Sequence, residues 1–287
     1  MALLEVNNIC KSFDTFKLNN VSFMIELGYI VGFIGRNGAG KTTTIKSILN
    51  ITKPDEGSVK FMGLDMKEHE SECKQQLGIV LGEFDYYPDK RLCAIAKVVS
   101  RFYSNWDEKA YKNYIKLFSI DEKKRVKELS TGLRVKFALA LALSHDAKLL
   151  ILDEPTSGLD PVSRDELMEI FRSIVADGKR SILFSTHITS DLDKVADYMV
   201  YIKQGEVIMN GDRETVINGF RLVQGPHEAL TASIMDILIG YRENAFGFTG
   251  LIREENIGKV YGLQIAKADI ENIMLYTEET AGKERKI

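Results

Sequence analysis

A glycine-rich octapeptide early in the chain has the residue types and spacing of a phosphate-binding loop. Residues 35–42, GRNGAGKT, match the pattern G-x-x-x-x-G-K-[ST]. Glycines let a backbone turn tightly and bring its N–H groups close to phosphate oxygens. Lys41 is expected to neutralise charge on the terminal phosphates, and the Thr42 hydroxyl to ligate Mg²⁺. The alternative is a turn that binds nothing. The residues predicted to contact the nucleotide phosphates are Gly35, Asn37, Gly38, Ala39, Gly40, Lys41, Thr42 and Thr43.

Two carboxylates follow an apolar run in the middle of the chain. Asp153 and Glu154 come directly after Leu149–Leu152, which reads as a buried strand. Ligands of open α/β sheets sit at the carboxyl ends of the strands. Asp153 is therefore predicted to hold Mg²⁺ through water and Glu154 to polarise an attacking water, a role typically worth about 10²–10⁴ in rate. Taken alone, the pair could equally be solvated acids that cap the next turn.

A histidine follows a third apolar run. His187 comes just after Ser181–Ser185, so its predicted place is the same edge of the sheet. A histidine there suits a sensor of the terminal phosphate, whereas a purely structural histidine is the alternative. Lys41, Glu154 and His187 form the predicted catalytic set.

Strand and helix patterns around these residues predict an α/β fold. Residues 29–34 form a continuous apolar run before the glycine loop, and helical spacing follows the loop. Further strand patterns at 148–152, 181–185 and 198–202 alternate with a helical pattern at 162–175. Residues 90–128 look like a charged helical insertion. After residue 211 scattered glycines and short apolar stretches predict a small α+β appendage, so the expected domains are 1–211 and 212–287.

Composition narrows the classes of function. The 287 residues carry a net charge of −3, which argues against a nucleic-acid partner held by a broad basic face. Three widely spaced cysteines fit reduced thiols better than a disulfide framework or a zinc site. No apolar run approaches the roughly 20 residues that span a bilayer. If the protein works at a membrane, another chain must cross it.

The order of the motifs resembles that of ABC-type ATPases over about residues 3–211. The glycine loop is followed by Leu129-Ser130-Thr131-Gly132-Leu133, the acids at 153–154, Ser157-Gly158-Leu159-Asp160 and Ser185-Thr186-His187. The resemblance implies a P-loop core with an N-terminal antiparallel β part and a helical subdomain at about 82–127. It also implies ATP and Mg²⁺ as cofactors, bound between two subunits packed head to tail.

The resemblance assigns further residues to the nucleotide. Ser130 and Gly132 would contact the γ-phosphate across the dimer interface, Asp160 would contact the partner's P-loop, and Phe13 would stack on adenine. Ser130 is also a good N-cap for the helical stretch 135–143, and a merely capped helix is the alternative.

Two departures from the family pattern concern hydrolysis. Thr131 and Leu133 stand where the usual signature has a glycine and a glutamine. Near residue 83 the family carries a glutamine, and Glu83 is the nearest polar substitute, which is predicted to hold Mg²⁺ or its water. A homodimer and a heterodimer with unequal sites both stay open.

The overall pattern is similar to the ATPase subunits of small bacterial exporters of peptides, lipids or antibiotics. The likeness implies an integral membrane permease as partner, a cytoplasmic place on the membrane face, and an aromatic groove that receives a permease helix. The aromatic residues expected there are Phe84, Tyr86, Tyr87, Phe102, Tyr103 and Trp106. The alternative for each of them is a place in the subdomain's own core.

Two other classes of function are alternatives to transport. A soluble ABC ATPase acting on DNA or ribosomes would need a long coiled coil or two cassettes, and the sequence has neither. A regulator that binds ATP without hydrolysing it fits the altered signature, but the intact Lys41, Asp153, Glu154 and His187 argue against it. The accessory segment 212–287 carries no catalytic pattern.

Overall fold

The computed structural model describes residues 2–81 and 87–283 and divides the chain into two compact units, 1–210 and 211–287. Strands and helices alternate along the first unit, and the predicted α/β class is confirmed.

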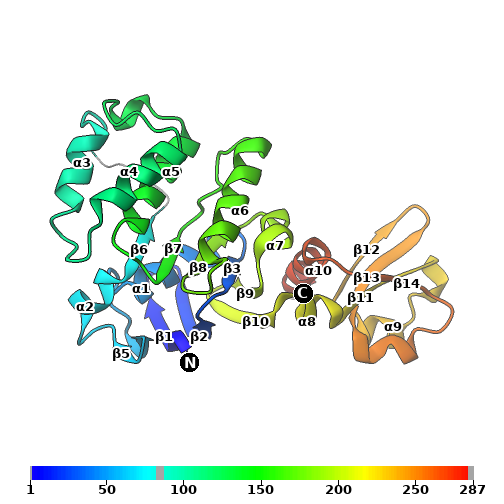
Figure 1. Cartoon of the computed structure of the whole chain (residues 1–287). Coiled ribbons are helices and arrows are strands. Elements are labelled where there is room, and N and C mark those ends of the chain that lie inside the picture. Colours follow the sequence, from blue (N-terminus) through cyan, green and yellow to red (C-terminus); the bar gives the residue numbers. More distant parts are fainter. Residues whose placement is uncertain (1, 82–86, 284–287) are drawn as a thin grey trace. The chain divides into compact units, whose positions relative to one another are not determined.

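The N-terminal unit is built on a six-stranded sheet of order β10-β9-β3-β8-β7-β6. The pairs β6–β7, β7–β8, β8–β3 and β3–β9 are parallel. Every residue of β3, β7 and β8 is buried, as expected of strands covered on both faces. Because β7, β8 and β3 are parallel neighbours, their carboxyl ends meet at one edge of the sheet (Figure 1). The strands are β3 (Ile30–Ile34), β6 (Leu77–Val80), β7 (Leu149–Leu152), β8 (Ser181–Thr186), β9 (Tyr198–Lys203) and β10 (Glu206–Asp212).

A second sheet of the same unit is antiparallel and has the order β2-β1-β4-β5. Its inner side chains, such as Leu4 and Val6, share one apolar cluster with Phe33 of the parallel sheet and Ile45 of helix α1. The expected N-terminal antiparallel part is present. Its strands are β1 (Ala2–Ser12), β2 (Lys17–Glu26), β4 (Glu56–Phe61) and β5 (Leu64–Asp65).

The predicted helical insertion consists of α3, α4 and the 3₁₀ turn η1, and the apolar helix α5 packs against α4. Figure 1 shows α3, α4 and α5 gathered beyond the parallel sheet. Asp107 caps α4 by accepting hydrogen bonds from the N–H groups of Lys109 and Ala110. The helices are α1 (Lys41–Ile48), α2 (Glu70–Gln75), α3 (Leu92–Val99), α4 (Glu108–Leu117), η1 (Val126–Glu128), α5 (Thr131–Leu143), α6 (Pro161–Val175) and α7 (Thr189–Val195).

The C-terminal unit is an antiparallel sheet of order β12-β13-β11-β14 with short helices. Val223, Phe248 and Ile252 form the centre of its apolar cluster. Helix α10 packs on β12 and β13, and a Cβ on Gly240 would lie 2.2 Å from the Tyr276 carbonyl oxygen. A glycine at 240 therefore allows this close approach. The elements are α8 (Arg213–Asn218), β11 (Phe220–Gly225), η2 (His227–Ala229), α9 (Ala232–Ile237), β12 (Gly240–Asn244), β13 (Gly247–Arg253), η3 (Glu254–Lys259), β14 (Gln264–Lys267) and α10 (Ile270–Lys283).

Candidate nucleotide site

The glycine loop joins the buried strand β3 to helix α1. Gly40 is the N-cap of α1 with φ of +113°, a conformation that L side chains rarely adopt. A Cβ on Gly35 would lie 2.5 Å from the Ile202 carbonyl oxygen, so the loop can pass close to β9 only with glycine there. Among the described side chains none caps the start of α1. Its first N–H groups are therefore available to an anion.

Lys41 is the first residue of α1, and its side chain folds back over the loop. It is only 5% exposed, and its Nζ donates hydrogen bonds to the carbonyl oxygens of Gly35 at 2.8 Å and Arg36 at 3.2 Å. The same ammonium pairs with Glu154 Oε1 at 3.0 Å. The lysine charge thus lies where the glycine loop and the end of β7 meet.

Asp153 is held by hydroxyl groups from two other segments. Thr42 Oγ1 donates to Asp153 Oδ2 at 2.7 Å, and Ser185 Oγ donates to Asp153 Oδ1 at 2.6 Å. Asp153 is 5% exposed, and its backbone N–H donates a hydrogen bond to the Val80 carbonyl oxygen. Such a pairing of a hydroxyl and a carboxylate presents the oxygen ligands that Mg²⁺ prefers.

Glu154 stands next to Asp153 in an unusual backbone conformation. Its φ of +51° places a non-glycine residue in the left-handed region, where steric cost is of order 1–3 kcal/mol. Its N–H donates to Ser185 Oγ at 2.9 Å, and its Oε2 lies 2.7 Å from His187 Nδ1. Lys41, Glu154 and His187 therefore form one continuous chain of contacts, which brings together the three residues of the predicted catalytic set.

A cavity of about 600 Å³ opens beside this cluster. Thr15 and Phe16, which sequence reasoning missed, line it together with predicted residues. Phe13 is 48% exposed, a position open to stacking on a flat base. The described lining residues are Phe13, Thr15, Phe16, Asn37, Gly38, Gly40, Lys41, Thr42, Thr43 and Glu154. Of the predicted loop residues, Gly35 and Ala39 are not among the described lining.

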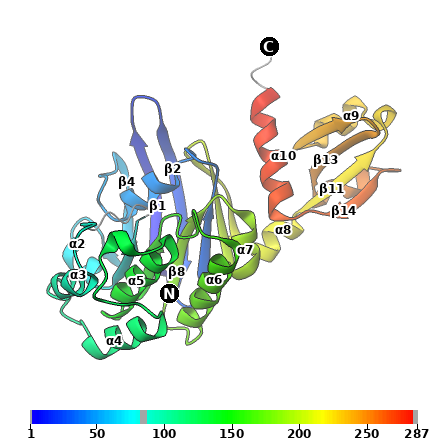
Figure 2. The same ribbon diagram turned by 90° about the horizontal axis from the view of Figure 1, so that it is seen from above.

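Ser130, Gly132 and Asp160 lie in a different place, at the starts of α5 and α6. Ser130 Oγ accepts a hydrogen bond from the N–H of Leu133 at 3.3 Å, so it caps α5. A Cβ on Gly132 would lie 3.6 Å from the side chain of Leu159, which places the two helix starts side by side (Figure 2). None of the three is among the described residues that line the 600 Å³ cavity.

Asp160 is the N-cap of α6 and an acceptor of three hydrogen bonds. Its Oδ1 accepts from the N–H groups of Val162 and Ser163, each at 3.0 Å, and its Oδ2 from the Ser163 hydroxyl at 2.6 Å. The Ser163 hydroxyl, followed by its N–H, lowers the pKa of the Asp160 carboxyl from its ordinary value. Asp160 is therefore expected to be ionised at neutral pH.

The predicted aromatic groove divides into exposed and packed members. Tyr87 and Phe102 are 74% and 72% exposed. Tyr103 stacks on His145 with ring centroids 3.6 Å apart, and Trp106 lies against Tyr111. The remaining residues of that prediction, Phe84 and Tyr86, and the predicted metal ligand Glu83 lie outside the described residues.

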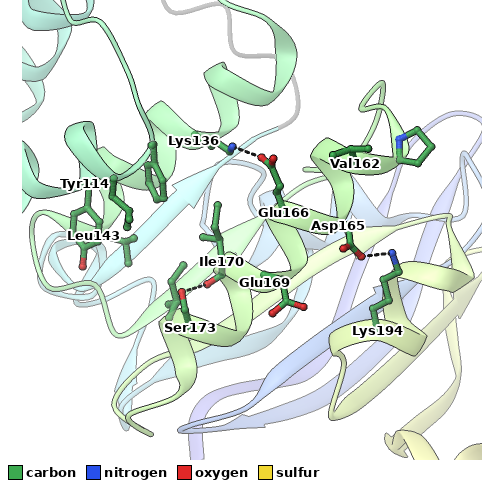
Figure 3. A pocket seen from close by; sticks show the side chains of 14 residues that line it. Tyr114, Lys136, Leu143, Val162, Asp165, Glu166, Glu169, Ile170, Ser173 and Lys194 are labelled. Atoms are coloured by element: carbon green, nitrogen blue, oxygen red, sulfur yellow. Dashed lines mark hydrogen bonds and ion pairs between the residues drawn. The ribbon is translucent and has the colours of Figure 1, made fainter.

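A larger cavity, of about 730 Å³, lies between helices α4 and α5 on one side and α6 on the other (Figure 3). Two ion pairs bound it: Lys136 with Glu166 at 2.7 Å, and Lys194 with Asp165 at 2.6 Å. Residues of the predicted catalytic set are not among its described lining. The first ion pair joins α5 to α6, and the second joins α6 to α7.

Comparisons with known proteins place the chain in a family. The ABC transporter family model matches residues 18–157. Nod factor export ATP-binding protein I of Burkholderia lata is 33% identical over 223 residues, which cover 76% of this chain and 73% of that protein. Lantibiotic transport ATP-binding protein SrtF of Streptococcus pyogenes is 33% identical over 210 residues, covering 72% of this chain and 90% of that one.

A solved structure agrees with these relatives. The ATP-binding subunit of an ABC transporter superposes with a TM-score of 0.67 and 27% identity, covering 75% of this chain and 91% of that one. The glycine loop between β3 and α1, facing the acids after β7, marks a P-loop ATPase. The chain belongs to the ATP-binding subunits of ABC transporters, and it binds and hydrolyses ATP. The resemblance seen in its motifs is confirmed.

Within residues 2–81 and 87–283, helices long and apolar enough to cross a bilayer are absent.

Proposed function

We propose that this subunit powers export through a separate membrane permease, from the cytoplasmic face of the membrane. The relatives support the direction, since one is a Nod factor exporter subunit and another serves lantibiotic transport. Peptide, lipid or antibiotic-like cargo would fit such relatives. Tyr87 and Phe102, both exposed aromatics, are the described candidates to contact a permease helix.

The observation that carries the proposal is the separation of two half-sites in one chain. The 600 Å³ cavity holds Lys41, Thr42 and Glu154, whereas Ser130 and Asp160 start helices elsewhere. A second ABC ATPase subunit packed head to tail would supply its own Ser130 and Gly132 to this cavity. ATP would then join two subunits, and its hydrolysis would release them.

Thr42, at the start of α1, and Asp153, at the end of β7, fit a bound magnesium ion. Thr42 and Asp153 already lie within 2.7 Å of each other, and both offer oxygen ligands. Thr42 would bind Mg²⁺ directly and Asp153 through water. The ion would neutralise phosphate charge when ATP is bound. The glycine loop and Lys41 would orient the triphosphate with its terminal phosphorus toward Glu154.

Glu154 is the proposed general base, and His187 its companion at the terminal phosphate. The Glu154 carboxylate would accept a proton from the attacking water. Its present partner, the Lys41 ammonium, is also the group that a triphosphate would attract. ATP binding is therefore expected to draw Lys41 toward phosphate and leave Glu154 free to hold water. His187 Nδ1 contacts Glu154 Oε2 and is positioned to keep that carboxylate oriented.

The alternative is a soluble or regulatory ABC ATPase that is not coupled to transport. Turnover measured with and without the membrane chain, in lipid vesicles, separates the two functions. An ATPase rate that changes on adding the permease supports transport. An identical rate with both preparations would favour the alternative.

The proposed dimer is tested by substituting Glu154→Gln, which removes the base and keeps the shape. With MgATP this variant is expected to elute as a dimer in size-exclusion chromatography, because ATP is bound and not consumed. Glu56→Gln, at an exposed residue of β4, is the matched control and should behave as wild type. Elution of Glu154→Gln as a monomer with saturating MgATP would contradict the proposal.

A further inference from the structure

A fully buried carboxylate outside the nucleotide cavity links two loops of the site. Asp191 lies on α7 and is 0% exposed. Its Oδ2 accepts hydrogen bonds from Thr156 Oγ1 at 2.7 Å and from Thr186 Oγ1 at 3.3 Å. Thr156 comes two residues after Glu154, and Thr186 comes directly before His187. One carboxylate oxygen therefore joins the segments that carry the proposed base and its companion.

The other oxygen of Asp191 faces a cation at a longer distance. Arg164 Nε lies 3.7 Å from Asp191 Oδ1, and within the described residues neither atom has a hydrogen-bond partner. Arg164 Nη2 donates to the Leu159 carbonyl oxygen at 3.5 Å. Burying a carboxylate is costly unless charge and hydrogen bonds compensate it. Here two threonine hydroxyls and a nearby guanidinium compensate that cost, so the buried carboxylate is held in a defined place.

The two loops are connected twice. The outer connection is Glu154 with His187, whose side chain is 39% exposed. The inner connection is Thr156, Asp191 and Thr186, all buried. The outer contact lies beside the nucleotide cavity, where a phosphate would compete with Glu154 for the Lys41 ammonium. The inner contact is buried, and its three residues are not among the described residues that line the nucleotide cavity.

Thr186 extends the inner connection to the backbone of Ile188, the residue that follows His187. Its Oγ1 accepts a hydrogen bond from the Ile188 N–H at 3.0 Å while it donates to Asp191. Thr186, before His187, is thus bonded to the Asp191 carboxylate, and Ile188, after His187, is bonded to Thr186. Arg164 adds the start of α6, because it lies four residues after Asp160.

We infer that Asp191 is a positioning residue for ATP hydrolysis. It holds the loop of His187 against the loop of Glu154, so that both side chains meet the terminal phosphate in one fixed arrangement. Asp191 itself does not touch the nucleotide. The inference rests on the proposed roles of Glu154 and His187, which a separate variant tests.

Threonine variants test the inference while leaving the Asp191 carboxylate itself in place. Thr156→Val and Thr186→Val keep the shape and remove one hydroxyl each, while Thr156→Ser and Thr186→Ser keep the hydroxyl. We expect each valine variant to lower the single-turnover rate of ATP hydrolysis by about 10-fold, since small misplacement of reacting groups is costly. The serine variants should stay within about 2-fold of wild type, and the dissociation constant for MgATP should be unchanged in all four.

A double variant tests whether both hydroxyls act through Asp191. In an Asp191→Asn background, adding Thr186→Val is expected to cost less than it does in the wild type, because the shared partner is already altered. Valine variants that hydrolyse at the wild-type rate, or serine and valine variants that lose rate equally, would overturn the inference. So would a loss of MgATP affinity that accounts for the loss of rate. Should Asp191→Asn fail to fold, the threonine pairs decide alone.

The control for the underlying roles is Glu154→Gln in the same assay. If Glu154→Gln hydrolyses ATP normally, the proposed base is wrong, whatever the threonine variants do. If Glu154→Gln is inactive while the valine variants remain fully active, the roles stand and the positioning by Asp191 is wrong.

Discussion

The Lys41 ammonium and the Glu154 carboxylate form an ion pair of 3.0 Å in the lining of the nucleotide cavity. One residue belongs to the start of α1 and the other to the end of β7, 113 positions apart by their numbers. In the proposed mechanism the ammonium would attract phosphate and the carboxylate would activate water. The ion pair would then couple nucleotide binding to release of the proposed base.

Replacing Thr42 separates metal binding from phosphate binding. Thr42→Val removes the hydroxyl that contacts Asp153, so the affinity for ATP with Mg²⁺ should fall about 10-fold. ATP affinity measured in EDTA should change little. Titration calorimetry under both conditions measures this difference. Thr42→Ser, which keeps the hydroxyl, should behave as wild type, and equal losses in the two variants would argue against a metal ligand at Thr42.

Ser185→Ala tests a residue that supports both acids at once. The Ser185 hydroxyl donates to Asp153 Oδ1 and accepts from the Glu154 N–H. Removing it leaves buried polar groups without their partner, at an expected cost of about 1–3 kcal/mol in free energy of unfolding. The unfolding free energy, measured by denaturant unfolding, and the steady-state ATPase rate should both decrease. Ser173→Ala, at an exposed residue of α6, is the control expected to change neither.

Some site residues can be predicted from a local sequence pattern, whereas others depend on how the strands and helices pack. The glycine loop is contiguous, so its eight residues are recognisable without knowledge of the fold. Ser185 depends on strand pairing: Leu152 lies opposite Phe184 in the β7–β8 register, which places the next residues, Asp153 and Ser185, together. A polar residue near the end of apolar β8 was the available signal.

Other site residues depend on packing that no local pattern encodes. Thr15 and Phe16 reach the cavity because the β1–β2 turn folds over the glycine loop. Asp191 meets Thr156 only because α7 packs beside α6 and β3. Charged residues on a short helix predict a solvated face, and the sequence offered no sign that this aspartate is buried.

His145 gives the protein a pH-dependent share of its stability. Burial lowers the pKa of His145 from 6.5 to about 4, although its Nδ1 lies 3.2 Å from the Gln75 carbonyl oxygen. Between pH 6.5 and about pH 4, the His145 ring is therefore protonated in the unfolded chain and neutral in the folded protein. Stability should fall as the pH decreases from 6.5 toward 4, by on the order of a few kcal/mol.

The contribution of His145 is isolated by comparing two proteins across this range. His145→Leu removes the titrating ring, so its unfolding free energy should depend less steeply on pH between 6.5 and 4. Urea unfolding at a series of pH values measures both slopes. Identical slopes for the wild type and the variant would show that His145 does not titrate as its burial implies.

Binding of MgATP to the wild type and to Lys41→Met, measured by titration calorimetry, tests the central claim most directly. In the proposed binding mode the glycine loop and the Lys41 ammonium hold the triphosphate, so the wild type should bind ATP in a magnesium-dependent manner. Loss of a charge-assisted hydrogen bond should weaken binding by about 10- to 100-fold in Lys41→Met, while Lys53→Met, at an exposed lysine, should bind normally. Magnesium-independent binding, or equal affinity in the wild type and Lys41→Met, would contradict the claim.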